Sequence, residues 1–121
     1  TRGYVLSQIE RHLEAVADFT MALQADWVFG NPSESSIRAI RCGRAFSFMK
    51  AKRYFEAVNE SSAVIDADPS STFMYFVRSV SYYCVNELDK ADADADAGLR
   101  LEPGGERFKL LKMEIAQARQ R

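Results

Sequence analysis

The chain of 121 residues is long enough for one domain with its own hydrophobic core, and its 47% apolar and 27% charged residues are typical of a globular protein. Its formal net charge of −1 argues against a general electrostatic attraction to nucleic acid or to anionic membranes. No apolar run approaches the ~20 residues that cross a bilayer, so we expect no membrane insertion. No signal peptide is visible in these residues, and a targeting sequence could lie outside them. Two cysteines without CxxC spacing favour a reducing compartment, so we expect a cytoplasmic protein.

The first strongly periodic stretch lies within residues 13–29. Its apolar residues recur at steps of three or four: Leu13, Val16, Phe19 and Leu23. This spacing places them on one face of a helix. No helix breaker occurs before the Gly-Asn-Pro sequence at 30–32, so the helix is predicted to continue through Val28 and Phe29.

The break at 30–32 also predicts where the next helix begins. Asn31 is a good N-cap, and Pro32 suits the first position of a helix. The next helix is therefore predicted from Ser33 to about Lys50.

The middle of the chain, residues 38–103, repeats itself after 34 places. The matching pairs are Arg44 with Arg78, Ser47 with Ser81, Phe48 with Tyr82, Ala57 with Ala91, Ala63 with Ala97, Ile65 with Leu99, and Pro69 with Pro103. A fixed period of this length is the signature of stacked helix–turn–helix units. The copies predict helices at about 54–67, from 69–71 to about 85, and at about 88–101.

The C-terminal segment is predicted to be a single amphipathic helix at 106–121. It follows the Pro-Gly-Gly stop at 103–105, and its apolar residues keep helical spacing: Phe108, Leu111, Ile115 and Ala118. The open end of a stacked array needs a cap with one polar face, and this helix fits that role. Its basic residues suit a helix C-terminus, and no interleaved aromatic faces the basic stripe, so we do not predict nucleic-acid binding.

The repeated unit has a recognisable residue pattern. A small residue precedes an aromatic by three places, as in Ala45 and Phe48; an alanine follows nine places later and a proline twelve places after that. This pattern resembles the tetratricopeptide repeat, which implies an all-α, right-handed superhelix of paired helices A and B. From Ala15 to Ala57 the spacing is 42 rather than 34, so eight residues are inserted. This layout is similar to that of the three-repeat domains of immunophilin-type co-chaperones.

The resemblance implies one domain that covers the whole chain. Its parts would be a truncated first repeat at 1–29, an insertion or linker at 30–37, the second repeat at 38–71, the third at 72–105, and a capping helix at 106–121. In the first repeat Gly3 would take the small-residue position of helix A, with Leu6 and Ile9 behind it. Residues 14–23 resemble helix B of the family, so we expect two helices, A and B, in residues 1–29.

No arrangement of residues predicts catalysis, a cofactor or a metal ion. His12 is the only histidine, and nothing pairs it with a nucleophile or places ligands around it. The aspartates at 92–96 mimic a calcium loop, but the glycine and glutamate that such a loop needs are missing, so we expect a solvated acidic helix face. Cys42 and Cys84 have no CxxC spacing and are predicted to be free thiols in a reducing compartment.

The concave face is the surface on which the resemblance predicts binding. In this family the A helices line that face, and the corresponding positions here are Ala39, Cys42, Gly43, Phe46, Met49 and Lys50 in the second repeat and Phe73, Phe76, Val77, Val80, Tyr83 and Cys84 in the third. Most of these residues are apolar. A large apolar patch on a globular protein usually marks an interaction site.

The same face argues against one known use of the fold. Co-chaperone members hold the C-terminal carboxylate of a heat-shock protein with a clamp of Lys, Asn and Arg side chains. The readable clamp positions here hold Tyr4, Gly43, Phe73 and Val77. A carboxylate needs charged or N–H donors to offset its desolvation. None of these four side chains is charged or carries an N–H group.

We therefore predict a protein–protein interaction module, a scaffold or adaptor without enzymatic activity, that buries the apolar side of a peptide or helix in its groove. The predicted anchors are Phe46, Met49, Phe73, Phe76, Val80 and Tyr83, with Lys50 at the rim. Three alternatives remain: a co-chaperone that binds a heat-shock protein without the clamp, a groove filled by another segment or by a second copy, and a register error that would make these residues core. Self-association would also use Trp27, Val28 and Phe29.

Overall fold

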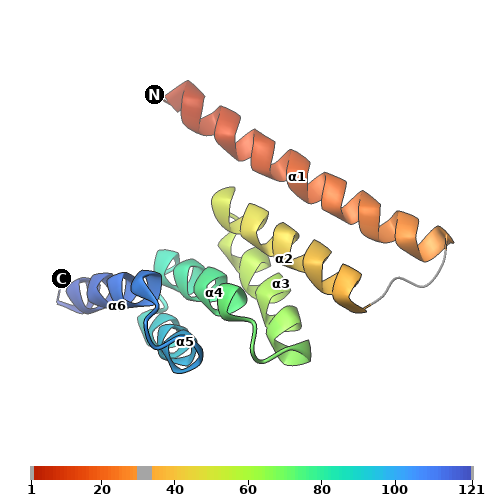
Figure 1. The fold of residues 1–121 in the computed structure, drawn as a ribbon. Helices are drawn as coiled ribbons and strands as arrows, with labels where there is room; N and C mark the ends of the chain where they lie inside the picture. Colours follow the sequence, from red (N-terminus) through yellow and green to blue (C-terminus); the bar gives the residue numbers. More distant parts are fainter. Residues whose placement is uncertain (1, 30–33, 121) are drawn as a thin grey trace.

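The structure, a computed structural model, describes the backbone of residues 2–29 and 34–120 and the side chains of 8–22, 24 and 36–120. The helices are α1 (Arg2–Phe29), α2 (Glu34–Lys50), α3 (Tyr54–Ala67), α4 (Thr72–Cys84), α5 (Leu88–Leu101) and α6 (Glu106–Arg119). The described backbone contains no β-strand. Successive helices run back and forth from α1 at the N-terminus to α6 at the C-terminus (Figure 1).

The helices form two layers. Each helix packs against the next one in the chain, and α4 also contacts both α2 and α6. Helices α2, α4 and α6 therefore form one continuous layer, with α3 and α5 packed between its members on the other side (Figure 1). The core lies where these layers meet, and its largest fully buried apolar side chains are Phe108, Met74, Ile115, Val64 and Val77.

The helix boundaries that the repeat predicts are confirmed for the second and third repeats. Helices α3 and α5 begin and end at the predicted residues, and α4 ends at Cys84, one residue early. Helix α2 ends at Lys50 as predicted and already includes Glu34, within the stretch assigned to the insertion. The predicted caps Asn31 and Pro32 lie outside the described residues.

The turn between α2 and α3 and the turn between α4 and α5 have the same backbone conformation and lie 34 residues apart. Lys52 and Asn86 both have a φ of 64°, a left-handed conformation that favours glycine or asparagine. After each of them an N–H closes the turn: the Arg53 N–H donates to Phe48 O at 2.8 Å, and the Glu87 N–H donates to Tyr82 O at 2.9 Å. The period therefore repeats down to the backbone hydrogen bonds.

The prediction of two helices in residues 1–29 is wrong, because α1 is a single helix from Arg2 to Phe29. The repeat period plus the eight inserted residues places a turn at Glu10, which is 42 residues before Lys52. The helix instead continues through this position. The residues from Ile9 to Leu13 include no glycine, proline or asparagine. Each of these five residues is compatible with the interior of a helix. The predicted continuation of the helix to Phe29 is confirmed.

A basic residue on each helix of the α2–α4–α6 layer joins this layer to the helices behind it. Arg44 of α2 donates a hydrogen bond from NH2 to Glu60 of α3 at 2.6 Å. Arg78 of α4, 34 residues later, donates from Nε and NH2 to Asp94 of α5, both at 2.8 Å. Each acid lies 16 residues after its base, so the pairs are equivalent in the two repeats.

The same basic positions also reach back to the preceding helix. The contacts are Arg44 with Thr20 at 3.3 Å, Arg78 with Ser62 at 3.1 Å, and Lys112 with Asp96. The last two span 16 residues and the first spans 24, which is 16 plus the eight inserted residues. The second part of α1 therefore occupies the place of helix B in this repeated series of contacts, as the sequence predicted.

The predicted solvated acidic face at 92–96 is wrong in part. Asp94 is buried against Arg78, and Lys112 of α6 lies 3.2 Å from Asp92 and also bonds Asp96. Hydrogen bonds to Asp96 and Asp92 raise the pKa of Lys112, so its ammonium group stays charged. The aspartates thus hold α4 and α6 onto α5.

Candidate functional site

The layer formed by α2, α4 and α6 corresponds to the predicted concave face, and we call it the concave layer. It includes α6, which the sequence analysis took only as a cap. Four α6 residues lie 34 places after predicted groove residues of α4: Arg107, Leu110, Leu111 and Glu114. Together with Phe76 and Val80 they line a pocket of about 250 Å³ between α4 and α6. The signal that could have found them was the 34-residue period, carried one step beyond the third repeat.

Two aromatic rings lie side by side where α2 meets α4. The centroids of Phe46 and Phe73 are 5.6 Å apart, with the ring planes tilted by 38°. Phe73 is 37% exposed, so a partner can reach its ring. The Lys50 ammonium lies 5.6 Å from the centroid of Phe46. At an exposed site such a cation–π contact contributes about 0.5–1 kcal/mol.

Arg107 lies over three rings at the other end of this row. Its guanidinium carbon is 5.8 Å from the centroid of Phe73, 5.1 Å from that of Phe76 and 5.4 Å from that of Phe108. Its Nε is buried without a hydrogen-bond partner, and Glu102 lies 3.9 Å from its NH2. The layer is therefore more basic than the sequence predicted, because two cations rest on its rings.

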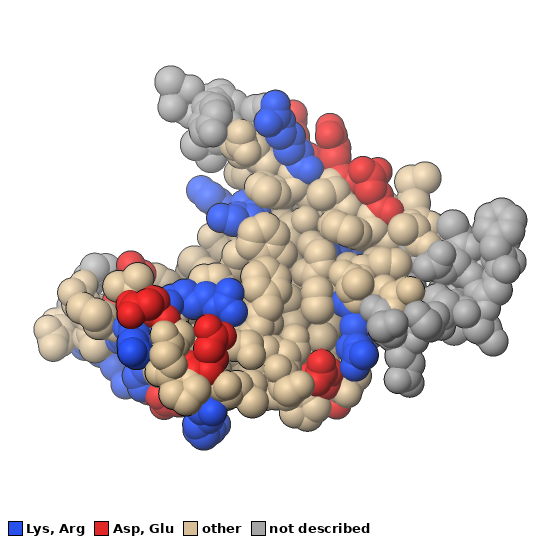
Figure 2. All heavy atoms as spheres, in the orientation of Figure 1, with Lys and Arg blue, Asp and Glu red and all other residues tan. Residues whose placement is uncertain are grey.

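The charge distribution of one molecular face agrees with this description. Figure 2 shows uncharged residues across the middle of the face, over α2, α3 and α4. The outline is indented between α2 and α6, and basic side chains stand on both sides of the indentation (Figure 2). Acidic and basic residues are mixed over α5 and α6.

Three of the predicted groove residues pack inside the protein. Met49 is 8% exposed and Val77 is fully buried, and both belong to the core cluster shared by α2, α3 and α4. At Gly43 a Cβ would lie 2.5 Å from the ring of Phe19, so this glycine lets α1 approach α2 closely. Met49 and Val77 are corrected to core residues, because a partner cannot contact them without opening the helix layers.

The remaining predicted residues are spread over the layer. Ala39 is exposed, Cys42 and Tyr83 are half-buried, and Cys84 is exposed at the end of α4. Burial raises the pKa of the Cys42 thiol, which keeps it protonated and a weak nucleophile. Burial, together with a hydrogen bond that the Tyr54 hydroxyl donates to Cys84, raises the pKa of Tyr54 to about 12. Cys84 therefore contacts Tyr54 of α3 rather than the row of rings formed by Phe46, Phe73 and Phe76.

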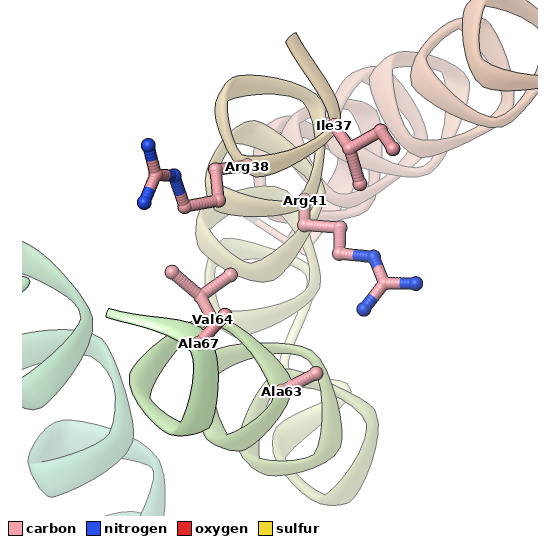
Figure 3. Close-up of a pocket in the computed structure, with 6 residues that line it drawn as sticks. All are labelled: Ile37, Arg38, Arg41, Ala63, Val64 and Ala67. Carbon is pink, nitrogen blue, oxygen red and sulfur yellow. The ribbon is translucent and has the colours of Figure 1, made fainter. Parts of the chain in front are cut away.

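A second pocket, of about 300 Å³, lies between α2 and α3. Its lining residues are Ile37, Arg38, Arg41, Ala63, Val64 and Ala67. The guanidinium groups of Arg38 and Arg41 point to opposite sides (Figure 3), and Arg38 lies 3.9 Å from Asp68. These cations do not converge on one ligand, so the concave layer is the stronger candidate.

Neither a metal-binding cluster nor a bilayer-spanning helix occurs among the described residues. In that part of the chain, no three or more His, Cys, Asp or Glu side chains are grouped so that they could hold a metal ion. None of the helices described combines the length and apolar character that crossing a bilayer requires. His12 is half-buried on α1.

The arrangement of the helices is shared with known proteins, although no protein-family model and no curated protein matches the chain. The TPR domain of Arabidopsis OM64 superposes with a TM-score of 0.77 at 18% identity, over 90% of this chain and 84% of that one. The second TPR domain of human RPAP3, solved in complex with the HSP70 peptide SGPTIEEVD, gives 0.74 at 23% identity over 95% and 89%. The first TPR domain of human RPAP3 gives 0.75 at 20% identity over 94% and 91%.

The stacked antiparallel helices and the repeated ion pairs define a helical-repeat protein. Its fold is that of a tetratricopeptide-repeat domain, an all-α right-handed superhelix. At 18–23% identity the likeness establishes the fold, and the function has to be argued from the site.

Proposed function

We propose that the chain is a protein–protein interaction module, a scaffold or adaptor without chemistry of its own. Its ligand is an amphipathic helix or an extended peptide that lies along the concave layer of α2, α4 and α6. The observation that carries this proposal is the row of rings and cations from Lys50 and Phe46 through Phe73 to Arg107. Both cysteines are free thiols, which supports the cytoplasm as the place of action.

The aromatic part of the row supports an apolar contact with the ligand. Phe46 and Phe73 come from different repeats and form one surface across the α2–α4 contact. Phe76 and Val80 continue it into the pocket next to α6. Aromatic side chains in a groove are the usual anchors of helix-in-groove recognition, with ligand residues at i, i+3, i+4 and i+7.

The two cations support an acidic partner beside the apolar anchors. Lys50 has no carboxylate within ion-pair distance in the described part of the chain, and Arg107 has only Glu102, at 3.9 Å. A carboxylate of the ligand would gain charge-assisted hydrogen bonds from either cation. The preferred ligand is therefore apolar along one side and acidic at its edge.

A matched pair of phenylalanine variants tests this proposal. Phe73→Glu changes an exposed ring on the concave layer, whereas Phe55→Glu changes a ring on α3 that is 72% exposed and outside that layer. Peptides selected against the wild-type chain from a display library should bind Phe73→Glu at least roughly tenfold more weakly. They should bind Phe55→Glu as they bind the wild type.

Circular dichroism of both variants serves as the folding control, because a loss of helicity would make weaker binding uninformative. Phe73 suits this test better than Phe76, whose ring lies 6.0 Å from that of the fully buried Phe108. Selected peptides that bind the folded Phe73→Glu variant as tightly as the wild type would contradict the proposal. So would a selection that yields only basic peptides.

A co-chaperone role is the second candidate, because the RPAP3 domain was solved with an HSP70 peptide that ends in Glu-Glu-Val-Asp. The peptide SGPTIEEVD tests it directly by fluorescence anisotropy. Since Gly43 faces Phe19 and Val77 is buried, two clamp positions offer no donor to this peptide. We expect weak binding that depends on Lys50 and Arg107; tight binding unaffected by Lys50→Glu would favour a different site.

A further inference from the structure

One side of α6, next to α4, carries a stripe of side chains that the described chain leaves partly exposed. Arg107, Leu110 and Glu114 follow at steps of three and four, so they lie along one side of the helix. Leu110 is 58% exposed, although it also lines the pocket formed with Phe76 and Val80 of α4. An exposed leucine next to an apolar pocket leaves both surfaces available to a partner.

The charges at the two ends of the stripe are only weakly matched or unmatched by carboxylates and cations of the described residues. Arg107 has only Glu102 at 3.9 Å, and Glu114 has no ion pair in the described residues. Seven residues separate these charges, or about 10.5 Å along the helix, too far for them to pair with each other. On the other side of α6, Lys112 and Arg119 are paired with aspartates of α5.

This stripe is complementary to a copy of itself. In a twofold contact the residue pair i and j occurs twice, once in each direction. Two antiparallel α6 helices with the axis between Leu110 and Leu111 would place Arg107 opposite the second copy's Glu114, and Glu114 opposite the second copy's Arg107. Glu114 would gain a basic partner, Arg107 would gain a second acidic one besides Glu102, and each Leu110 would face the pocket of the other copy.

We propose that a second copy of this chain docks on the α4–α6 pocket, with the two α6 helices antiparallel. Charge self-complementarity about Leu110 favours this occupant over an unrelated helix, which would need an independent match at both ends. A contact centred on one pair of 14-residue helices is smaller than the ~800 Å² per partner of a standard interface. The dimer is therefore weak and depends on protein concentration.

Charge reversal tests the proposal by sedimentation equilibrium over a wide concentration range. The wild type should show a reversible monomer–dimer equilibrium. Arg107→Glu places two acidic residues at each end of the contact, and Glu114→Arg places two basic residues there. Each single variant should weaken the dimer by roughly tenfold or more, because like charges then face each other.

Mixing the two single variants gives the most specific result. In a mixed dimer every acid faces a base, so the mixture should associate although neither variant does so alone. The double variant Arg107→Glu with Glu114→Arg should dimerise like the wild type. A wild type that stays monomeric at the highest concentration, or single variants that dimerise normally, would overturn the proposal. So would a mixture that fails to associate.

Two further variants keep the test independent of folding. Arg107 packs on three rings, so Arg107→Glu requires a check of helicity. Leu110→Lys changes an exposed residue at the twofold axis and should abolish the dimer without loss of helicity; a normal dimer would overturn the proposal. Lys109→Glu alters the charge of the same helix outside the pocket and should leave the dimer intact.

The dimer goes beyond the proposed peptide function and can fail separately from it. Phe46, Phe73 and Lys50 on α2 and α4 lie outside the α4–α6 pocket. Lys50→Glu should therefore weaken peptide binding and leave the dimer intact. Loss of the dimer in Lys50→Glu would contradict this separation of the two surfaces.

Discussion

The second and third repeats share one register but differ in how well their helices are joined. In the third repeat Arg78 binds both carboxylate oxygens of Asp94 at 2.8 Å. In the second repeat Arg44 makes a single bond to Glu60 at 2.6 Å, and the Arg44 Nε and the Glu60 Oε2 are buried without partners. Asp94 is one methylene shorter than Glu60 and is held as a bidentate pair, which is the stronger arrangement. The 34-residue period thus determines which basic and acidic positions lie opposite each other. The length of the acidic side chain determines how many hydrogen bonds each pair makes.

The largest effect is expected from breaking the better pair. Asp94→Ala leaves Arg78, whose side chain is 19% exposed, with Ser62 as its remaining hydrogen-bond partner. Removing one member of a buried ion pair costs about 3–5 kcal/mol, because a desolvated charge stays behind. Denaturant unfolding should show this loss as a lower midpoint. A loss below that of Glu60→Ala would reverse the ranking of the two repeats.

The next effect concerns two close approaches of helices at glycine. A Cβ at Gly98 would lie 2.3 Å from the ring of Phe108, which is fully buried and has no room to move. Gly98→Ala should destabilise by about 1–3 kcal/mol, since overpacking outweighs the gain in helix propensity. At Gly43 the facing ring belongs to Phe19, which is half-buried and can turn outward. Equal losses of thermal stability in Gly43→Ala and Gly98→Ala would contradict this difference.

A smaller effect is expected from breaking the weaker pair. Glu60→Ala removes one bond to Arg44 but also removes a buried carboxylate oxygen that has no partner. Arg44 keeps its hydrogen bond to Thr20. The expected loss is about 1–2 kcal/mol, and a double-mutant cycle of each pair would compare the two coupling energies directly. A coupling at Arg44–Glu60 as large as that at Arg78–Asp94 would show that bidentate geometry adds nothing here.

The smallest effect separates the two equivalent turns. Lys52 and Asn86 have the same φ of 64°, but asparagine tolerates this conformation better than lysine. Lys52→Asn should stabilise the protein, and Asn86→Lys should destabilise it, each by about 0.5–1 kcal/mol. Opposite shifts of the unfolding midpoint would confirm this reading. Shifts of the same sign would mean that contacts of the side chains outweigh the backbone preference.

The sequence predicted most of what depends on the repeat. The bounds of α3 and α5 and the place of the second part of α1 as helix B follow from matching residues at a fixed spacing. The predicted helix ranges also leave the short gaps in which the turns at Lys52 and Asn86 lie.

The errors arose where contacts, rather than spacing, decide the structure. At Glu10 the register suggested a turn, but the local residues favour a helix, and in the described part of the chain α2 is the one helix that packs against α1. The burial of Met49 and Val77 depends on how deeply α2, α3 and α4 interdigitate, which the sequence pattern does not determine. Arg107 was missed because α6 was assigned as a cap, although its position follows Phe73 by the same 34 residues.

The most direct test of the central claim is an amide chemical-shift map by NMR with a peptide selected against the wild-type chain. If the concave layer is the binding surface, the largest shifts should fall on α2, α4 and the start of α6, around Phe46, Phe73 and Arg107. Amides around Phe55 on α3 should stay unchanged. Shifts concentrated on α3 and α5, with those around Phe73 unaffected, would contradict the account.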